Sequence, residues 1–145
     1  MKMNRTVKSI IGWVVYILIL VGLVYGIPKG LAYVLKTDFP MATITSGSMW
    51  PALKQGDLVL IKGVEGKDEI NIGDIIVYQN PKGFTIHRVI KMKEDTLITK
   101  GDANNVEDSP IEYEEIIGRA VTINDNPVRI PFVGKIGFLI NKAKI

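Results

Sequence analysis

The chain has 145 residues, a formal net charge of +3 and no cysteine. The length fits one domain beside a membrane segment, and the weak, scattered positive charge argues against nucleic acid as a partner. Without cysteine, disulfides and a thiol nucleophile are excluded. With a single histidine as well, the chain has a poor ligand set for zinc, so we expect no metal and no cofactor.

The first element is an apolar run at residues 10–27, IIGWVVYILILVGLVYGI, which carries no charged side chain. As a helix it spans about 27 Å, close to the roughly 30 Å hydrocarbon core of a bilayer. Trp13, Tyr16, Tyr25 and Tyr33 lie toward its ends, as interfacial aromatic residues do. We therefore predict an uncleaved transmembrane anchor within residues 1–36. A cleaved signal peptide or a buried core helix is disfavoured by the length of the run and by its lack of a polar stripe.

Basic residues on the two sides of this run indicate its orientation. Three precede it and two follow it, namely Lys2, Arg5, Lys8, Lys29 and Lys36. No acidic residue precedes the run, whereas Asp38 follows it. The positive-inside rule then places the N-terminus in the cytoplasm and residues 37–145 outside it, as an extracytoplasmic domain.

After Asp38 the pattern changes to short apolar, β-branched runs separated by turn residues. We predict strands at 41–45, 57–62, 74–79, 84–91, 96–99 and 118–123. Gly-Asp pairs at 56–57, 73–74 and 101–102 indicate turns, and 111–117 indicates a short helix. The expected fold is mostly β, a small twisted sheet or partial barrel behind one N-terminal transmembrane helix.

The segment 130–140 is apolar but too short to span a membrane, and Lys135 interrupts it. One interpretation is a last strand or core segment. The other is a patch that dips into the membrane surface, with Lys142 and Lys144 near lipid headgroups.

Three groups of side chains could carry chemistry. Ser48 stands in Ser-Gly-Ser-Met-Trp-Pro at 46–51, His87 is the only histidine, and Asp102 and Asp108 lie in a polar turn with Glu107. A serine, an imidazole and a carboxylate are the parts of a serine hydrolase. Each also has a plainer explanation, as a loop serine, a structural histidine on a strand, or a solvated acidic turn.

The order of several short segments is more specific than any one of them. Ser-Gly-Ser-Met-x-Pro is followed by Gly-Asp-Leu-Val at 56–59, Gly-Asp-Ile-Ile-Val at 73–77, Ile-His-Arg-Val-Ile at 86–90 and Thr-Lys-Gly-Asp at 99–102. This series resembles type I signal peptidase, in the Ser–His subclass found in archaea, in the endoplasmic-reticulum complex and in some Gram-positive bacteria. The resemblance implies a membrane-anchored serine endopeptidase that removes signal peptides from translocated preproteins.

Position by position, the resemblance implies Ser48 as nucleophile and His87 as general base. Asp108 matches the acidic residue that orients the base, and Asp102 matches a second, supporting aspartate. The main-chain N–H of Ser48 and the Ser46 hydroxyl would form the oxyanion hole. Whether Asp102 or Asp108 orients His87 stays open at the level of sequence.

The same resemblance implies where the enzyme works and what it meets. The substrate would lie extended beside 41–45, and the partners would be preproteins, the lipid bilayer and translocon or accessory subunits. The location would be the cell membrane, or the endoplasmic-reticulum membrane in a eukaryote. The alternatives are a regulatory or self-cleaving protease of the same fold, and a non-enzymatic membrane-anchored binding module.

Overall fold

The computed structural model describes residues 4–81 and 83–134. Contacts within the chain divide it into two compact units, Met1–Val34 and Leu35–Ile145. The first unit is almost entirely one helix, and the second contains all the strands, so each is described by itself.

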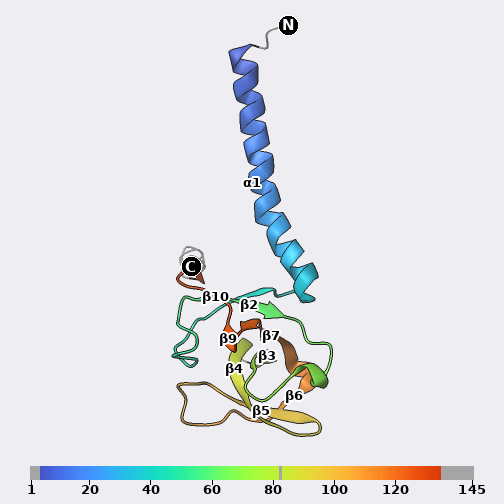
Figure 1. The fold of residues 1–145 in the computed structure, drawn as a ribbon, viewed down its shortest axis with the longest axis vertical. Coiled ribbons are helices and arrows are strands. Elements are labelled where there is room, and N and C mark those ends of the chain that lie inside the picture. Colours follow the sequence, from blue (N-terminus) through green and yellow to red (C-terminus); the bar gives the residue numbers. More distant parts are fainter. Residues whose placement is uncertain (1–3, 82, 135–145) are drawn as a thin grey trace. The chain divides into compact units, whose positions relative to one another are not determined.

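The helix, α1, runs without interruption from Arg5 to Leu35 and includes Pro28 (Figure 1). Its 31 residues extend over about 46 Å. None of its side chains is buried, and its apolar surface runs all the way round, which suits contact with lipid. By length and composition it is long and apolar enough to cross a bilayer, and it is the one such helix in the described part of the chain. The prediction of an N-terminal apolar helix is confirmed.

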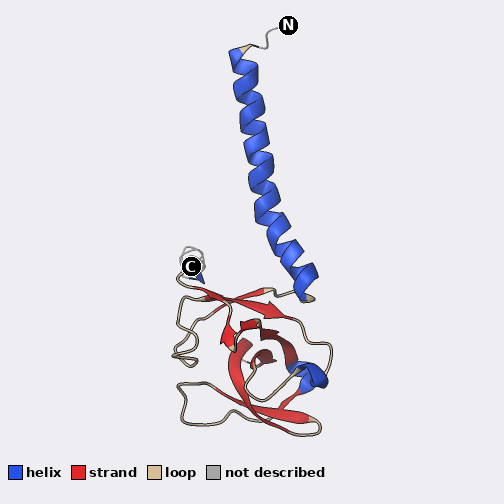
Figure 2. Ribbon diagram, in the orientation of Figure 1, coloured by secondary structure: helices blue, strands red, loops and turns tan. Residues whose placement is uncertain are grey.

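The second unit is an antiparallel β structure (Figure 2). The longer strands are β2 (Leu58–Lys62), β3 (Ile75–Asn80), β4 (Gly83–Met92), β5 (Thr96–Lys100) and β7 (Ile116–Ala120), and the shorter ones are β1 (Met41–Thr43), β6 (Ile111–Glu112), β8 (Thr122–Ile123), β9 (Asn126–Pro127) and β10 (Arg129–Ile130). One eight-stranded sheet has the order β1-β2-β7-β3-β4-β5-β6, with β10 also paired to β2, and β8 and β9 form a separate hairpin. In Figure 1, β2 and β5 lie on opposite sides of the domain with β3, β4 and β7 between them. The prediction of a mostly β domain is confirmed.

Two of the predicted elements differ from those in the structure. The short helix expected at 111–117 is reduced to a 3₁₀ helix at Tyr113–Glu115, because β6 leads into it and β7 follows directly. The Glu112 side chain accepts from the Glu115 backbone N–H, and the Glu115 side chain accepts from the Glu112 backbone N–H. This capping box stabilises the turn without a longer helix. The strand expected at 118–123 is divided at Val121 into β7 and β8.

The core lies on both faces of the sheet because β3 is buried on both. Its residues alternate, so Ile75 and Val77 point to one face and Ile76 and Tyr78 to the other. The first cluster comprises Ile44, Met49, Leu53, Val59, Ile61, Ile75, Val77 and Ala120. The second comprises Ile70, Ile76, Tyr78, Val89, Leu97 and Ile111. A strand so enclosed holds its neighbours in a fixed register.

Two of the predicted Gly-Asp turns share one construction. Gly56 and Gly73 have φ angles of 89° and 99°, which glycine adopts without steric cost. The following aspartates, Asp57 and Asp74, each accept a bond from the backbone N–H three residues earlier. Arginines on later strands complete the arrangement, Arg129 with Asp57 at 2.7 Å and Arg119 with Asp74 at 3.3 Å. Distant strands are thereby tied to these turns.

Of the apolar segment 130–140, Ile130 belongs to β10 and the next residues form a turn. Residues 135–145 lie outside the described part of the chain, and with them most of the segment for which two interpretations were given.

Truncating Leu53 tests how strongly the loop after β1 depends on the core. Leu53 is fully buried in the first cluster, so Leu53→Ala should lower the free energy of unfolding by about 2–5 kcal/mol. Chemical denaturation in detergent, followed by hydrogen exchange of the strand amides, measures it. Ile72→Ala, at an exposed site, should change stability by no more than about 0.5 kcal/mol. Equal effects of the two substitutions would contradict this assignment.

Candidate active site

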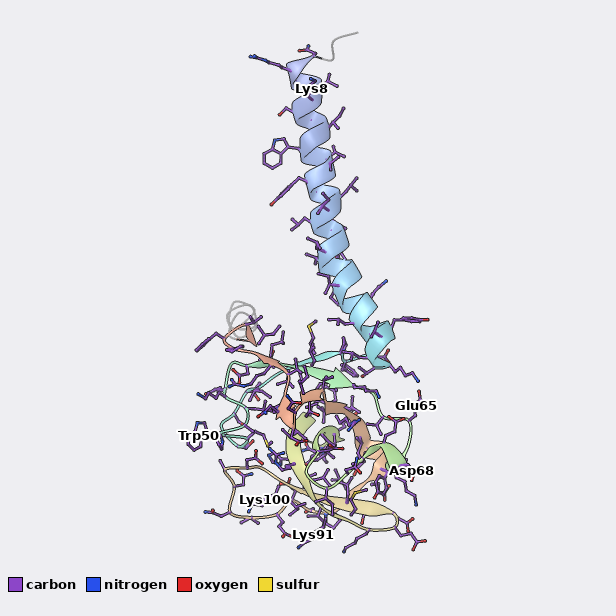
Figure 3. All side chains as sticks on the ribbon, in the orientation of Figure 1. Lys8, Trp50, Glu65, Asp68, Lys91 and Lys100 are labelled. Atoms are coloured by element: carbon purple, nitrogen blue, oxygen red, sulfur yellow. The ribbon has the colours of Figure 1, made fainter. Side chains whose placement is uncertain are left out.

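Ser48 lies in the loop between β1 and β2, and buried side chains on either side hold that loop in place. Ile44 precedes it in the first core cluster, and Met49 and Leu53 follow. The Leu53 N–H donates to the Met49 carbonyl at 2.9 Å, closing a turn immediately after the serine. Trp50 is exposed and points away from the domain (Figure 3), so the loop is held by its small and aliphatic residues. The serine is thus presented by a loop whose ends are fixed in the core.

Ser48, His87 and Asp108 form one hydrogen-bonded chain. The Ser48 Oγ lies 3.2 Å from His87 Nε2, and His87 Nδ1 lies 2.5 Å from Asp108 Oδ2. A carboxylate can only accept, so Nδ1 carries the proton and Nε2 is free to accept the serine's proton. Ser48 and His87 are 39 positions apart in the sequence, and His87 and Asp108 are 21 apart, so the fold brings them together.

Strand register explains how these groups meet. His87 on β4 stands directly opposite Ile76 on β3, and Val89 stands opposite Thr99 on β5. Residues opposite one another in an antiparallel pair project from the same face, so one face carries the imidazole and the Thr99 side chain. The Asp108 N–H then donates to the Thr99 carbonyl at 2.8 Å, which brings the carboxylate to that face.

Asp102 has a different place from Asp108. Its two carboxylate oxygens accept from Arg88 Nε at 2.8 Å and Nη2 at 2.7 Å, a bidentate ion pair. The hydrogen bond to Asp102 raises the pKa of the Arg88 guanidinium. The next residue, Ala103, donates its N–H to the Ser48 carbonyl at 2.8 Å. Asp102 therefore anchors the turn that holds Ser48, while the contact with the imidazole belongs to Asp108.

The remaining acidic residue of the turn, Glu107, points elsewhere. It forms an exposed ion pair with Lys91 at 2.9 Å. In the described part of the chain, no group of three or more His, Asp or Glu side chains is placed to hold a metal ion.

Ser46 adds a second hydroxyl beside the serine. Its Oγ lies 3.1 Å from the Ser48 Oγ and 3.5 Å from the Ser48 backbone nitrogen. A backbone N–H and a hydroxyl beside a half-buried serine are the kinds of donor that hold an oxyanion.

Sequence reasoning missed three residues of this site. Arg88 pairs with Asp102 as described, and the hydroxyls of Tyr78 and Thr99 both contact Asp108. Burial raises the pKa of the Tyr78 phenol, and the nearby Asp108 carboxylate raises it further. Arg88 and Thr99 lie within the matched segments, and Tyr78 lies two residues along from Ile76, the partner of His87. Residues alternate between the two faces along β3, so this alternation could have placed Tyr78 on the same face as Ile76.

The serine and histidine line a cleft of about 640 Å³. Its walls come from 41–46 on one side and from the start of β4 on the other, and most are apolar, with Asn104 beside the serine. Along β1 the sheet order ends, so the strand edge away from β2 carries no strand from the described residues. A backbone edge beside an apolar cleft suits an extended peptide.

The Asp102–Arg88 pair should contribute to stability more than an exposed pair does. In this pair the side chains are 17% and 31% exposed, against 66% and 63% for Glu65 and Lys36. We expect Asp102→Asn to lower the free energy of unfolding by about 1–3 kcal/mol, and Glu65→Gln to have a smaller effect because solvent screens the exposed pair. Denaturation of both variants at the same salt concentration compares them, and a larger loss for Glu65→Gln would refute the assignment.

Comparison with known proteins agrees with this geometry. The family model described as Peptidase S24-like matches residues 26–121, which include Ser48, His87 and Asp108. The signal peptidase complex catalytic subunit SEC11 of Metarhizium acridum is 34% identical, over 79% of this chain and 71% of its own length. The corresponding subunits of Neurospora crassa and Chaetomium globosum are 35% and 31% identical over the same shares. The chain therefore belongs to the peptidase S24-like family, together with the SEC11 catalytic subunits of signal peptidase complexes.

Proposed function

We propose that this protein is a membrane-anchored serine endopeptidase that removes signal peptides from translocated preproteins. The observation that carries the proposal is the hydrogen-bonded chain from Ser48 through His87 to Asp108, at the wall of an apolar cleft. Relatives at 31–35% identity are named as catalytic subunits of signal peptidase complexes, which supports the substrate class.

In the proposed mechanism, His87 Nε2 takes the Ser48 proton as the Ser48 Oγ attacks the scissile carbonyl. Asp108 holds the imidazole in the required tautomer and stabilises the imidazolium that forms. The Ser48 N–H and the Ser46 hydroxyl donate to the oxyanion, and one such donor is typically worth about 3–4 kcal/mol. His87 then protonates the leaving amine, leaving an ester on Ser48. Water attacks this ester with His87 again as the base, which restores the serine.

The substrate would lie extended along the free edge of β1, with its backbone bonding to Met41–Thr43 and its side chains entering the cleft. Small residues near the cut are what the resemblance to signal peptidase implies. The described lining is mostly apolar and holds no acidic, lysine or arginine side chain, which supports uncharged residues there.

The membrane would act as a common scaffold for enzyme and substrate. We propose that residues 1–36 are the cytoplasmic N-terminus and transmembrane anchor, and that 37–145 are the extracytoplasmic protease domain. Signal peptides are themselves apolar segments, so holding enzyme and substrate in one membrane raises the effective concentration of the substrate at the active site. The relatives' names describe a complex, so we further propose accessory or translocon subunits as partners.

The site disfavours both alternatives. A binding module needs no serine in contact with a histidine–aspartate pair, whereas this chain places all three within hydrogen-bonding distance. The regulatory or self-cleaving proteases of this fold considered as rivals use lysine as base, and this chain has His87 in contact with the serine.

Removing the nucleophile or the base should abolish cleavage. Ser48→Ala and His87→Ala should each lower kcat/KM for a preprotein by at least about 10³-fold, because the remaining groups cannot form the ester. Gel-based cleavage by the detergent-solubilised chain is the measurement. Ser109→Ala, at an exposed serine beside the acidic turn, should retain activity. Substantial cleavage by Ser48→Ala would refute the assignment.

The two aspartates should differ in the kind of loss they cause. Asp108→Asn removes the acceptor of the Nδ1 proton and favours the wrong tautomer, so kcat should fall by about 10²–10⁴-fold. Asp102→Asn disturbs only the turn behind Ser48, and a loss of about tenfold or less is expected. Single-turnover cleavage compares them. A greater loss for Asp102→Asn would reverse their roles.

A further inference from the structure

We propose that the hydroxyls of Tyr78 and Thr99 are positioning groups that hold the Asp108 carboxylate against His87 Nδ1 and so keep the imidazole in the tautomer that can accept the Ser48 proton. This inference rests on the proposed function for its catalytic consequence, and on geometry alone for its effect on the imidazole.

Three side chains converge on one oxygen atom. Asp108 Oδ2 lies 2.7 Å from Thr99 Oγ1, 3.3 Å from the Tyr78 hydroxyl and 2.5 Å from His87 Nδ1. Thr99 is completely buried and Tyr78 is 4% exposed, so water does not replace these donors readily. The two hydroxyls are also in contact with each other, at 3.4 Å. They come from β3 and β5, the strands on either side of the His87 strand.

These contacts determine the orientation of the carboxylate. The backbone fixes only the position of Asp108 along the turn, through its N–H bond to the Thr99 carbonyl. Its side chain could otherwise rotate, because no strand encloses it. Two buried donors aimed at Oδ2 leave one orientation favourable, and in that orientation the same oxygen meets Nδ1. The imidazole is thereby held with Nε2 toward Ser48.

The hydroxyls thereby also determine the tautomer of the imidazole. A carboxylate held against Nδ1 can only accept, so the proton stays on Nδ1 and Nε2 is free to accept from Ser48. Removing either donor should loosen this contact and allow the form with the proton on Nε2.

Other charged groups around the site are already paired. On β4, Arg88 is engaged by Asp102 and Lys91 by Glu107, the residue preceding Asp108. From β5, Lys100 is half-buried and follows Thr99 with its side chain on the opposite face. From β3, Tyr78 is the titratable group, and burial together with Asp108 raises its pKa, so it stays a neutral donor at neutral pH.

The test removes one oxygen atom at a time. Tyr78→Phe and Thr99→Val keep the shape of the side chain and delete the hydroxyl, while Thr99→Ser keeps the hydroxyl. Matched controls are Tyr113→Phe, which loses a bond to the Lys93 carbonyl, and Thr96→Val at the other end of β5. All are made in the full chain, in detergent, and their thermal unfolding is recorded.

The readout is the nitrogen NMR spectrum of the neutral imidazole, in which the forms protonated on Nδ1 and on Nε2 give different signals. It needs no assignment because His87 is the chain's only histidine. We expect the Nδ1–H form in the parent chain and a mixture of the two forms in Tyr78→Phe and Thr99→Val. In both variants kcat should fall about 3–10-fold with KM little changed. Thr99→Ser and both controls should match the parent chain.

A fold-stabilising role alone would lower the unfolding temperature without changing the tautomer. Folded Tyr78→Phe and Thr99→Val that both keep the Nδ1–H form of the parent would overturn the proposal. The spectrum needs no substrate, so a tautomer change in the variants of a chain that cleaves no preprotein would support the positioning role and count against the proposed function. Ser48-dependent cleavage with no tautomer change in either variant would do the reverse.

Discussion

The partly buried contact between the His87 imidazole and the Asp108 carboxylate is the interaction on which the rest of the site depends. A carboxylate in a partly enclosed place is costly unless donors satisfy it. Here an imidazole N–H and two hydroxyls all approach Oδ2. Because these donors come from three adjacent strands, the sheet must keep its register for the carboxylate to be satisfied. Correct pairing of these strands is thus needed both for the stability of the sheet and for the orientation of the base.

The loops around the cleft are secured by a repeated arrangement of aspartate and arginine. Asp57, Asp74 and Asp102 each follow a glycine, and each binds an arginine from the strand paired with the one beside its turn. Arginine suits this use because its planar group can hold a carboxylate with two parallel bonds and keeps its charge at any ordinary pH. The third pair also places Ala103 against the Ser48 carbonyl. A domain without disulfides can in this way hold its functional loops at several points.

The two units of the chain solve different physical problems. In α1 the backbone groups away from the two ends and from Pro28 bond within the helix, so its apolar side chains can face lipid on all sides. In the sheet, strands bond to one another and bury apolar faces, while among the described residues no strand pairs with the edge of β1 beside the cleft. Proposed as a signal peptidase, the protein would use the first unit for location and the second for chemistry.

Much of the fold could be predicted from local pattern. The uncharged run at 10–27 indicates a helix of membrane length, and alternation within 84–91 places His87 and Val89 on one buried face, as found. Segment 111–117 could not be assigned in this way. Its glutamates and apolar residues suit a helix. The reciprocal bonds between Glu112 and Glu115 instead close a short turn, and the pairing of β7 with β3 makes the following residues a strand. Tertiary pairing outweighed local propensity there.

Of the site, the sequence by itself determined which groups were available: one histidine, a serine in a glycine-containing loop and two aspartates in one turn. Only the tertiary structure decided between Asp102 and Asp108, since both lie within reach of the same turn. Arg88 engages the first, and the β3–β4–β5 register aligns Tyr78, His87 and Thr99 around the second. A hydrogen bond requires atoms within about 3 Å of each other, and such proximity is set by strand pairing across the sheet rather than by spacing along the chain.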